Sequence, residues 1–492
     1  MENLLTLLES NQLGGQIIAQ NSQQSLSATN LISRCYRLAK VLIQREIKVL
    51  ALHGDNSIEW LIVDLACQQA SICLVPLPTF FSSEQLQYIL NSAPIDAILT
   101  EKKELLNELS CSDNSKSEET ILQRYHLLRL NHNKISNALP KHTHKITFTS
   151  GSTGKPKGVC LSTSQMLKHA KVLAETISLK KQRHLCLLPL STLLENIAGL
   201  YLPLSSGGEV IIPSLAEIGF SGSSTLNTEK FCQSISKYEP NSIILTPQLL
   251  IALIAAIDTG WSPPLSLQFI AVGGSKLSRQ VLSRTQELNL PVYEGYGLSE
   301  CTSVVSLNTV KNNKISSCGK PLPHLNVEID NGEIIVSGNI MLGYLNEPDS
   351  WNKEKIHSGD LGAIDDEGFL TINGRKNNLL ISSFGRNVNP EWVESELLSH
   401  TSILECVALG DAKPYLIALL TPRDTNSTNE SLQRVINACN NRLPDYAQIK
   451  KWHRLSQPLH KQHNLITDNG RPIRHAIRAR YKDCIESLYS TN

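Results

Sequence analysis

The sequence predicts an α/β protein with a large N-terminal domain of several subdomains and a small α+β domain at the C-terminal end. Three observations lead to this fold class. At 492 residues the chain is too long for one hydrophobic core. Strand-like runs alternate with helical patterns from residue 29 to residue 300, which is typical of parallel βαβ units. After residue 375, shorter strands and helices form a second group.

Composition narrows the function classes. Lys plus Arg number 46 and Asp plus Glu number 45, so the charge favours neither a nucleic acid nor an anionic membrane surface as main partner. No apolar run approaches the roughly 20 residues of a membrane span. The start, MENLLTLLESNQ, lacks the basic end and cleavage site of a secretory signal. We therefore expect a cytoplasmic protein with no integral membrane segment and no nucleic-acid partner.

The cysteines indicate neither disulfides nor a metal centre. All 12 are scattered singly, and none has C-x-x-C spacing. Buried free thiols behave as small hydrophobes, and we expect most of these residues to lie in the core.

The first 100 residues contain alternating elements. Apolar side chains recurring on one face predict a helix over 29–45, and a turn with a capping serine at Ser57 precedes the next helix. The polar stretch 107–120 is expected to be a surface excursion. We predict helices over 29–45, 58–69 and 82–91, and strands over 49–52, 73–78 and 97–100.

A loop rich in glycine and hydroxyl residues follows a strand at 145–149 and fits a polyphosphate. Glycine lets backbone N–H groups approach anionic oxygens, while hydroxyls add donors and lysines add compact positive charge. The expected contacts are Thr149, Ser150, Gly151, Ser152, Thr153, Gly154, Lys155, Lys157 and Gly158.

This loop differs from a P-loop. A P-loop places Ser or Thr after its lysine to bind magnesium, whereas Pro156 follows Lys155 here. A flexible Ser/Gly hairpin is the alternative, although paired lysines between two apolar strands are unusual for a linker.

Further along, helices are predicted over 163–176 and 248–258 and strands over 242–247 and 267–272, the last ending at Gly273. A strand from Val292 is expected to end at Glu294. Gly295 and Gly297 then bracket Tyr296, whose ring could lie against a base, and Glu300 could hold Mg²⁺ through its carboxylate oxygens. Taken alone, this stretch could equally be a glycine-rich turn with a solvated glutamate.

Asp360 lies between Gly359 and Gly362, where its carboxylate could accept hydrogen bonds from vicinal ribose hydroxyls. A turn-capping aspartate is the alternative. We place the domain boundary at Arg375, with a large domain over 1–374 and a small one over 375–492. In the small domain we predict strands over 379–382, 406–410 and 415–420, and helices over 390–398, 429–439 and 475–481.

Four motifs occurring in this order resemble the adenylate-forming superfamily of acyl-CoA synthetases, nonribosomal peptide adenylation domains and firefly-type luciferases. They are TSGSTGKPKG at 149–158, VYEGYGLSECTSV at 292–304, HSGD at 357–360 and the closing TDNGRPIR at 467–474. The resemblance covers nearly the whole chain.

The resemblance implies an ATP site. Tyr296 would stack on adenine, Ser299 would contact the α-phosphate, and Glu300 would bind magnesium. Asp360 and Arg375 would contact the ribose, and the turn at Gly273 would pack close to the nucleotide and the acyl chain.

It also implies a mobile small domain that turns about a hinge at Asn377. Gly385 resembles the glycine over which a pantetheine arm passes. Arg471 stands where relatives have the lysine that bridges the acyl carboxylate and the α-phosphate. Ser358 and Thr192 also depart from the usual residues of the family.

The implied activity is ATP-dependent, AMP-forming ligation of a carboxylic acid to a thiol, with ATP, Mg²⁺ and CoA. A fatty acid is the first choice, because the segment 185–195 offers no aspartate for an amino-acid ammonium, only Glu195. The alternatives are loading of a phosphopantetheinyl carrier protein, a non-catalytic adenylate-binding homologue and a light-emitting oxygenase.

Overall fold

The structure is a computed structural model of the chain. It describes residues 2–11, 13–102, 119–122, 124–130, 138–150, 156–221, 225–381, 383, 386–462, 465–467 and 471–490. Most of the predicted excursion at 107–120 lies outside these residues. So do five loop residues and one small-domain residue of the predicted site, which are Gly151, Ser152, Thr153, Gly154, Lys155 and Gly385.

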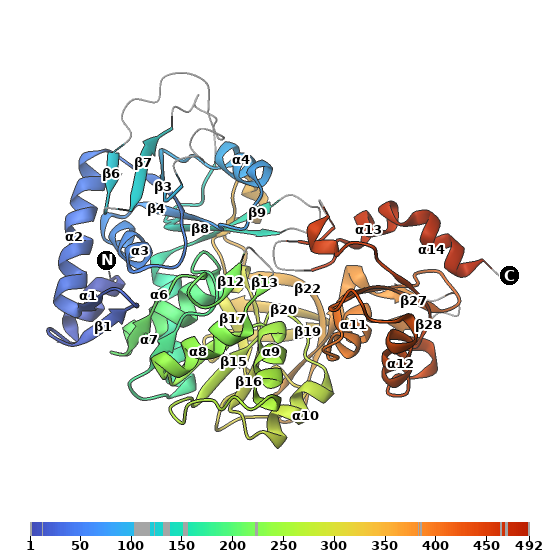
Figure 1. Cartoon of the computed structure of the whole chain (residues 1–492). Coiled ribbons are helices and arrows are strands. Elements are labelled where there is room, and N and C mark those ends of the chain that lie inside the picture. The colour runs from blue at the N-terminus through green and yellow to red at the C-terminus, as the bar shows by residue number, and fades with distance from the viewer. Residues whose placement is uncertain are drawn as a thin grey trace.

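An eight-stranded sheet carries the predicted βαβ units (Figure 1), and the α/β fold class is confirmed. β3 pairs in parallel with β4 and β5, and the crossover helix α3 begins after Ser57, whose hydroxyl accepts the N–H of Trp60. The strands are, in sheet order, β21 (Gly343–Tyr344), β9 (Pro156–Leu161), β8 (Lys145–Ser150), β4 (Cys73–Leu77), β3 (Val49–His53), β5 (Ala97–Thr100), β7 (Tyr125–Arg129) and β6 (Glu119–Ile121).

A nine-stranded sheet forms the second half of the large lobe. β14, β15 and β16 run parallel to one another, so their carboxyl ends meet at one edge, where ligands of open α/β sheets bind. The order is β18 (Lys320–Pro321), β17 (Ser303–Leu307), β16 (Val292–Leu298), β15 (Phe269–Val272), β14 (Ser242–Leu245), β10 (Arg183–Leu185), β11 (Glu209–Ile211), β1 (Ile17–Gln20) and β2 (Ser25–Ser27). β12 (Phe220–Ser221) and β13 (Thr225–Leu226) form a separate hairpin.

The prediction that a strand ends at Glu294 is wrong. β16 continues to Leu298 and pairs antiparallel with β17. Glycine makes this continuation possible, because a Cβ at Gly297 would lie 1.8 Å from the carbonyl oxygen of Ser303. The sequence showed the glycines but not the partner strand that requires one of them.

Helices cover these two sheets. They are α1 (Leu4–Ser10), α2 (Ala28–Gln44), α3 (Ile58–Ala70), α4 (Ser83–Ser92), α6 (Thr163–Ile177), a π-helix (Glu195–Tyr201), α7 (Leu202–Ser205), α8 (Thr228–Tyr238), α9 (Pro247–Asp258) and α10 (Arg279–Glu287). None of the helices in the described part of the chain combines the length and the apolar character that a bilayer crossing requires.

A buried charge network ties the first sheet to the π-helix. Lys145 on β8 lies 2.9 Å from the Asp64 carboxylate and donates to Asn196 and Tyr201. Asn196 and Tyr201 also donate to Asp64. The buried Lys145 ammonium therefore has one charged and two polar partners, as a charge taken out of water requires.

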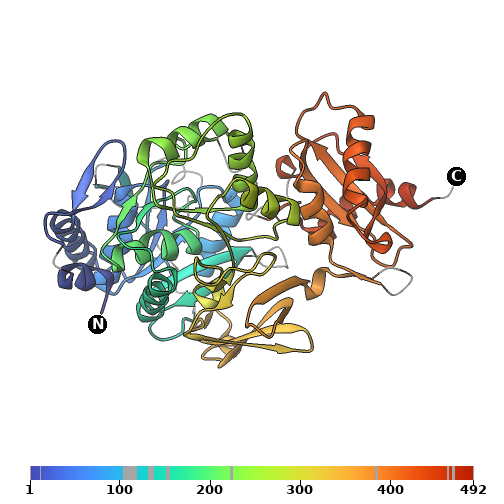
Figure 2. The same cartoon turned by 90° about the horizontal axis from the view of Figure 1, so that it is seen from below.

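A four-stranded sheet lies beside the large lobe (Figure 2). Its strands are β19 (Leu325–Asp330), β20 (Glu333–Gly338), β22 (Lys355–Ile364) and β23 (Leu370–Arg375). β22 and β23 are antiparallel, and their register sets Asp360 opposite Arg375. Two residues 15 positions apart in sequence are therefore cross-strand neighbours.

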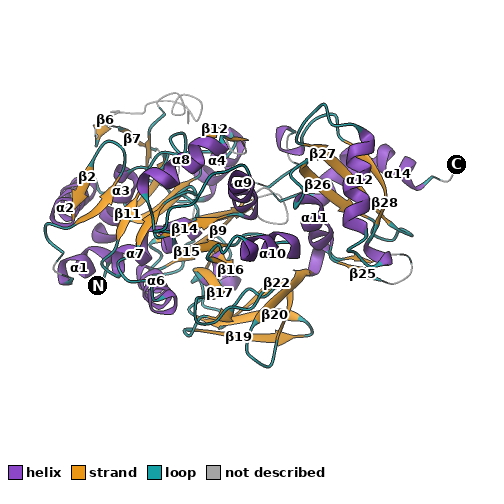
Figure 3. Ribbon diagram, turned by 60° about the horizontal axis from the view of Figure 1, so that its bottom comes forward, coloured by secondary structure: helices purple, strands orange, loops and turns teal. Residues whose placement is uncertain are grey.

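The last 110 or so described residues form a smaller lobe with its own hydrophobic cores (Figures 1 and 3). β26 pairs antiparallel with β27, and β27 pairs in parallel with β28. The elements are β24 (Leu380–Ile381), β25 (Asn387–Val388), α11 (Pro390–Leu398), β26 (Ile403–Leu409), β27 (Leu416–Pro422), α12 (Asn429–Asn440), β28 (Ile449–Arg454), α13 (Arg474–Arg480) and α14 (Lys482–Tyr489).

The two lobes meet along the turn and helix that follow β15. In Figure 3, α10 faces α11 of the smaller lobe. Ser399 donates to Gln280 (3.3 Å), and Arg471 donates to the carbonyl of Gly274 (2.6 Å).

Candidate active site

A single cleft of about 3180 Å³ runs between the lobes. The predicted site residues whose side chains or backbone the structure describes meet there, although they come from five strands, two short 3₁₀ helices and two loops. Those that line it are Thr149, Lys157, Gly273, Gly295, Tyr296, Gly297, Ser299, Glu300, Asp360, Arg375, Asn377 and Arg471. Ser150 ends β8 beside the cleft.

Asp360 organises one end of this cleft. It is 5% exposed; one oxygen lies 2.7 Å from Nε of Arg375, and the other accepts the Tyr296 hydroxyl at 2.7 Å. Burial raises the pKa of Asp360, and the neighbouring Arg375 opposes that rise. Ser358 stabilises the turn before Asp360, because its hydroxyl accepts the Asp360 N–H. The Asp360 side chain is thus directed to Tyr296 and Arg375, and each oxygen keeps a lone pair for a ribose hydroxyl.

Glu300 follows β16 in a short 3₁₀ turn, Ser299–Cys301. Its backbone carbonyl accepts the N–H of Met341 at 2.7 Å, and its Oε1 accepts the Tyr344 hydroxyl at 2.8 Å. Among the described residues, Oε2 has no hydrogen-bond partner. Magnesium is commonly held by one or two carboxylates together with substrate phosphates, so this half-buried carboxylate fits the ion.

Lys157 stands where β9 leaves the glycine-rich loop, opposite Thr149 on β8. Its ammonium lies 3.1 Å from the Glu347 carboxylate and 4.8 Å from the centre of the Tyr344 ring. Both groups are accessible enough that we expect the ion pair to be weak, and the lysine can exchange it for a phosphate.

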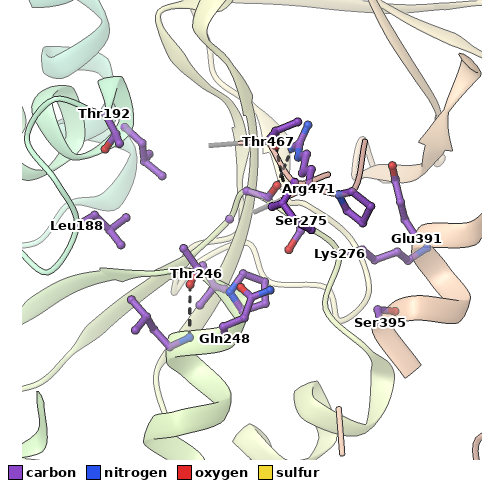
Figure 4. Close-up of a pocket in the computed structure, with 18 of the residues that line it drawn as sticks. Leu188, Thr192, Thr246, Gln248, Ser275, Lys276, Glu391, Ser395, Thr467 and Arg471 are labelled. Atoms are coloured by element: carbon purple, nitrogen blue, oxygen red, sulfur yellow. Dashed lines mark hydrogen bonds between the residues drawn. The ribbon is translucent and has the colours of Figure 1, made fainter. Parts of the chain in front are cut away.

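Arg471 reaches the cleft from the smaller lobe (Figure 4). Its guanidinium donates to the Gly274 carbonyl, and its N–H donates to Thr467 at 3.0 Å. Desolvation of the guanidinium and the nearby Arg375 lower the pKa of Arg471, though an arginine stays charged. Gly274 has φ +93°, a left-handed conformation that suits glycine.

A residue that sequence reasoning did not assign anchors the loop of Arg471. Arg474 pairs with the buried Glu394 at 2.7 Å and donates to the Ala408 carbonyl at 2.9 Å. Glu394 in turn accepts the Ala408 N–H. The signal was present, because Arg474 is the last residue of the closing motif.

Two titratable residues that the sequence did not single out, Glu294 and Lys276, also line the cleft. Burial raises the pKa of Glu294 to about 7, and Lys276 opposes the rise. Burial lowers the pKa of Lys276. Glu294 directly precedes Gly295, and nothing in the sequence indicated that its pKa would be shifted.

The opposite wall of the cleft is mostly aliphatic. Figure 4 shows Leu188 and Thr192 on one side, with Thr246, which caps α9, and Gln248 on α9 below. Apolar side chains on this wall include Leu193, Leu194, Phe220, Leu226, Ile244, Leu249 and Ile251. Glu195, the acidic residue noted for this segment, does not line the cleft; it is fully buried, 3.2 Å from Nε2 of His184.

The fold, two lobes around a cleft with these polar groups, is that of the adenylate-forming enzymes. Comparisons with known proteins agree. The AMP-binding enzyme model matches residues 10–345, and the AMP-binding enzyme C-terminal domain model matches residues 377–492. The chain belongs to the AMP-binding enzyme family, and the resemblance to the adenylate-forming superfamily is confirmed.

Curated relatives include acid–CoA ligases of two kinds. The long-chain-fatty-acid–CoA ligase FadD15 of Mycobacterium bovis is 28% identical over 444 residues, covering 74% of this chain and 71% of that protein. The 2-succinylbenzoate–CoA ligase of Bacillus mycoides is 26% identical over 447 residues, covering 86% and 87%.

Solved structures agree in fold. The anthranilate CoA ligase AuaEII in complex with anthranoyl-AMP superposes with a TM-score of 0.83 at 16% identity, covering 99% of this chain and 98% of that one. The o-succinylbenzoate CoA synthetase MenE of Bacillus subtilis in complex with ATP and magnesium has a TM-score of 0.77 at 23% identity, covering 97% and 99%.

Proposed function

We propose that this protein is an AMP-forming acid–CoA ligase that activates a carboxylic acid with ATP and transfers the acyl group to a thiol. ATP, Mg²⁺ and CoA are the cofactors and co-substrates of such ligases. The observation that carries the proposal is the convergence of Lys157, Glu300, Asp360 and Arg471 on one cleft.

In this proposal Tyr296 lies against adenine and Asp360 accepts the ribose hydroxyls, with Arg375 beside it. Ser299 meets the α-phosphate. The turn at Gly273 and the glycines 295 and 297 leave room for the nucleotide. The loop contacts are Thr149, Ser150, Gly151, Ser152, Thr153, Gly154, Lys155 and Lys157, of which residues 151–155 lie outside the described residues.

The first half-reaction forms a mixed anhydride. A carboxylate oxygen of the acid attacks the α-phosphorus of ATP, the bond to the β-phosphate oxygen breaks, and pyrophosphate leaves. Arg471 supplies positive charge where the acid and α-phosphate meet, and Lys155 and Lys157 offset charge on the leaving group. Magnesium, held through Glu300, would neutralise charge on the phosphates.

In the second half-reaction a thiol attacks the acyl carbonyl, its proton is lost, and AMP leaves. We propose that the small domain, 375–492, turns about a hinge at Asn377 against the large domain, 1–374, between the two steps. This motion would break the Arg471 contact with Gly274 and bring the loop of Gly385 to the thiol.

A fatty acid is the substrate class we favour. The residues of 188–194 and of α9 that line the cleft include no acidic side chain to hold an ammonium, and most are aliphatic. The similarity to FadD15 supports this choice.

An aryl acid of the 2-succinylbenzoate kind is the second candidate. Relatives with that activity align over a larger share of the chain. Thr192, Thr246 and Gln248 add polar groups to the wall that a fatty acid would not use.

Acid-dependent ATP–pyrophosphate exchange, run with fatty, aryl and amino acids, tests both candidates. We expect exchange with fatty acids, and the preferred acid should form a thioester with CoA rather than with a carrier protein. Selective exchange with amino acids would contradict the substrate proposal. ATP binding without exchange for any acid would favour a non-catalytic homologue, and light emission would indicate an oxygenase.

A further inference from the structure

Tyr344 links two separate parts of the proposed ATP site. It lies on β21, which pairs with β9 so that Tyr344 is opposite Val159, two residues beyond Lys157. Its hydroxyl donates to Oε1 of Glu300 at 2.8 Å. The Lys157 ammonium lies 4.8 Å from the centre of its ring.

The backbone around Tyr344 is fixed. Its N–H donates to the Ser350 hydroxyl, and its carbonyl accepts the Trp351 indole N–H, both at 2.8 Å. The neighbouring Gly343 has φ +144°, and a Cβ there would lie 2.4 Å from the Trp351 ring. Packing and hydrogen bonds therefore set where the tyrosine hydroxyl points.

The bond leaves Glu300 in one orientation. A carboxylate has two oxygens. The Tyr344 hydroxyl bonds Oε1, and Oε2 has no hydrogen-bond partner in the part of the chain that the structure describes. Partners that orient a metal ligand in this way typically change metal affinity by about 10- to 100-fold when removed.

We propose that Tyr344 is a positioning residue whose hydroxyl holds Glu300 for magnesium, while its ring lies against the Lys157 ammonium. The inference rests on the proposed function, because it takes Glu300 as the magnesium ligand. The hydroxyl and the ring act on different partners, so they can be separated by substitution.

The chain contains a matched control. Tyr238 donates its hydroxyl to Glu217 at 2.7 Å and has the Lys237 ammonium 4.7 Å from its ring centre. It repeats the same three side-chain types away from the cleft. Tyr238→Phe therefore removes an equivalent bond without touching the proposed site.

The test measures Mn²⁺ binding to the full-length protein by electron paramagnetic resonance, with and without ATP. We expect Tyr344→Phe to weaken ATP-dependent Mn²⁺ binding by about 10- to 100-fold, while metal-free ATP binding and the Tyr238→Phe variant stay at wild-type values. Glu300→Gln should show a similar loss, and the double variant should lose no more than Glu300→Gln alone, because both act through one carboxylate.

Three results would overturn the inference, and only the last of them would also overturn the proposed function. Equal Mn²⁺ affinity in wild type and Tyr344→Phe would remove Tyr344 from metal binding. Additive losses in the double variant would show that Tyr344 does not act through Glu300. Both results would leave the ligase proposal intact. Wild-type protein that binds no Mn²⁺ with ATP would overturn the proposed function as well.

Discussion

The two walls of the cleft differ in how their side chains are held. On the wall proposed to bind the nucleotide, Asp360, Tyr296 and Glu300 each have a hydrogen-bond partner that fixes a direction. On the wall proposed to bind the acyl group, which we call the acyl wall and which includes 188–194 and α9, most side chains are aliphatic and contact the core through packing. A directed polar wall suits a ligand of fixed structure, whereas an apolar wall discriminates by size and shape.

The comparison predicts its largest effect at Asp360. Asp360→Ala leaves Arg375 and the Tyr296 hydroxyl without their partner, each at a cost of about 1–3 kcal/mol. We expect kcat/KM for ATP to fall by at least about 100-fold, measured by pyrophosphate release, with the KM of the acid little changed. Tyr296→Phe, which keeps the ring, serves as the milder control. Equal effects on ATP and acid would argue against separate walls.

Arg471 reaches the cleft from the smaller lobe, and its removal should separate the two half-reactions. Arg471→Ala should slow acyl-adenylate formation by about 10²- to 10³-fold, because a charge aimed at the transition state is lost. Thioester formation from supplied acyl-adenylate should stay near wild type, since the proposed rotation of the small domain moves this residue out for that step. Arg471→Lys should recover part of the first rate. Loss of both steps together would contradict this division.

A block on the acyl wall should change acid selection alone. Ala252 on α9 lines the cleft, and Ala252→Trp would fill the space beside Ile251 and Ala255. We expect the KM of long-chain acids to rise by about 10-fold or more, with short-chain acids and ATP affected less. Steady-state kinetics over a chain-length series measures this. A uniform loss across chain lengths would place the acyl group elsewhere.

Glu294 gives the smallest effect, a pH dependence of stability. Its folded pKa is raised to about 7, against 4.5 for the free side chain, so the folded protein holds the proton more tightly than the unfolded chain does. The stabilisation is present below pH 4.5 and is lost as pH rises through 7, at up to about 1.4 kcal/mol per pH unit. Glu294→Gln should therefore exceed wild type in unfolding free energy at pH 8 by about 1–3 kcal/mol. The two should be similar at pH 5. Urea unfolding at both values measures this, and an equal difference at both would exclude titration as the cause.

The same contrast explains what the sequence could predict. The residues proposed to bind the ribose and the phosphates lie beside glycines, as Tyr296 and Asp360 do, and this local pattern made them predictable. The pairing of Asp360 with Arg375 needed the β22–β23 register, and the extension of β16 past Glu294 needed β17 beside it. Tyr344 lies 44 residues from Glu300, and no local pattern links the two.

The residues of the acyl wall were harder to predict from the sequence than those of the polar wall. From the sequence, the aliphatic side chains at 188–194 could lie either in a hydrophobic core or in a pocket. Only the structure distinguishes the residues that line the cleft from those packed behind it. Glu195 illustrates this, because its place in the sequence suggested the pocket while its carboxylate is buried against His184. Packing depends on contacts from distant segments, which a single sequence does not record.

The most direct test of the ligase account is acid-dependent exchange of labelled pyrophosphate into ATP by the purified protein. We predict exchange that requires both Mg²⁺ and a carboxylic acid, reaches its highest rate with a long-chain acid and falls sharply in Glu300→Gln. ATP binding in the cleft with no exchange for any acid offered would contradict the account.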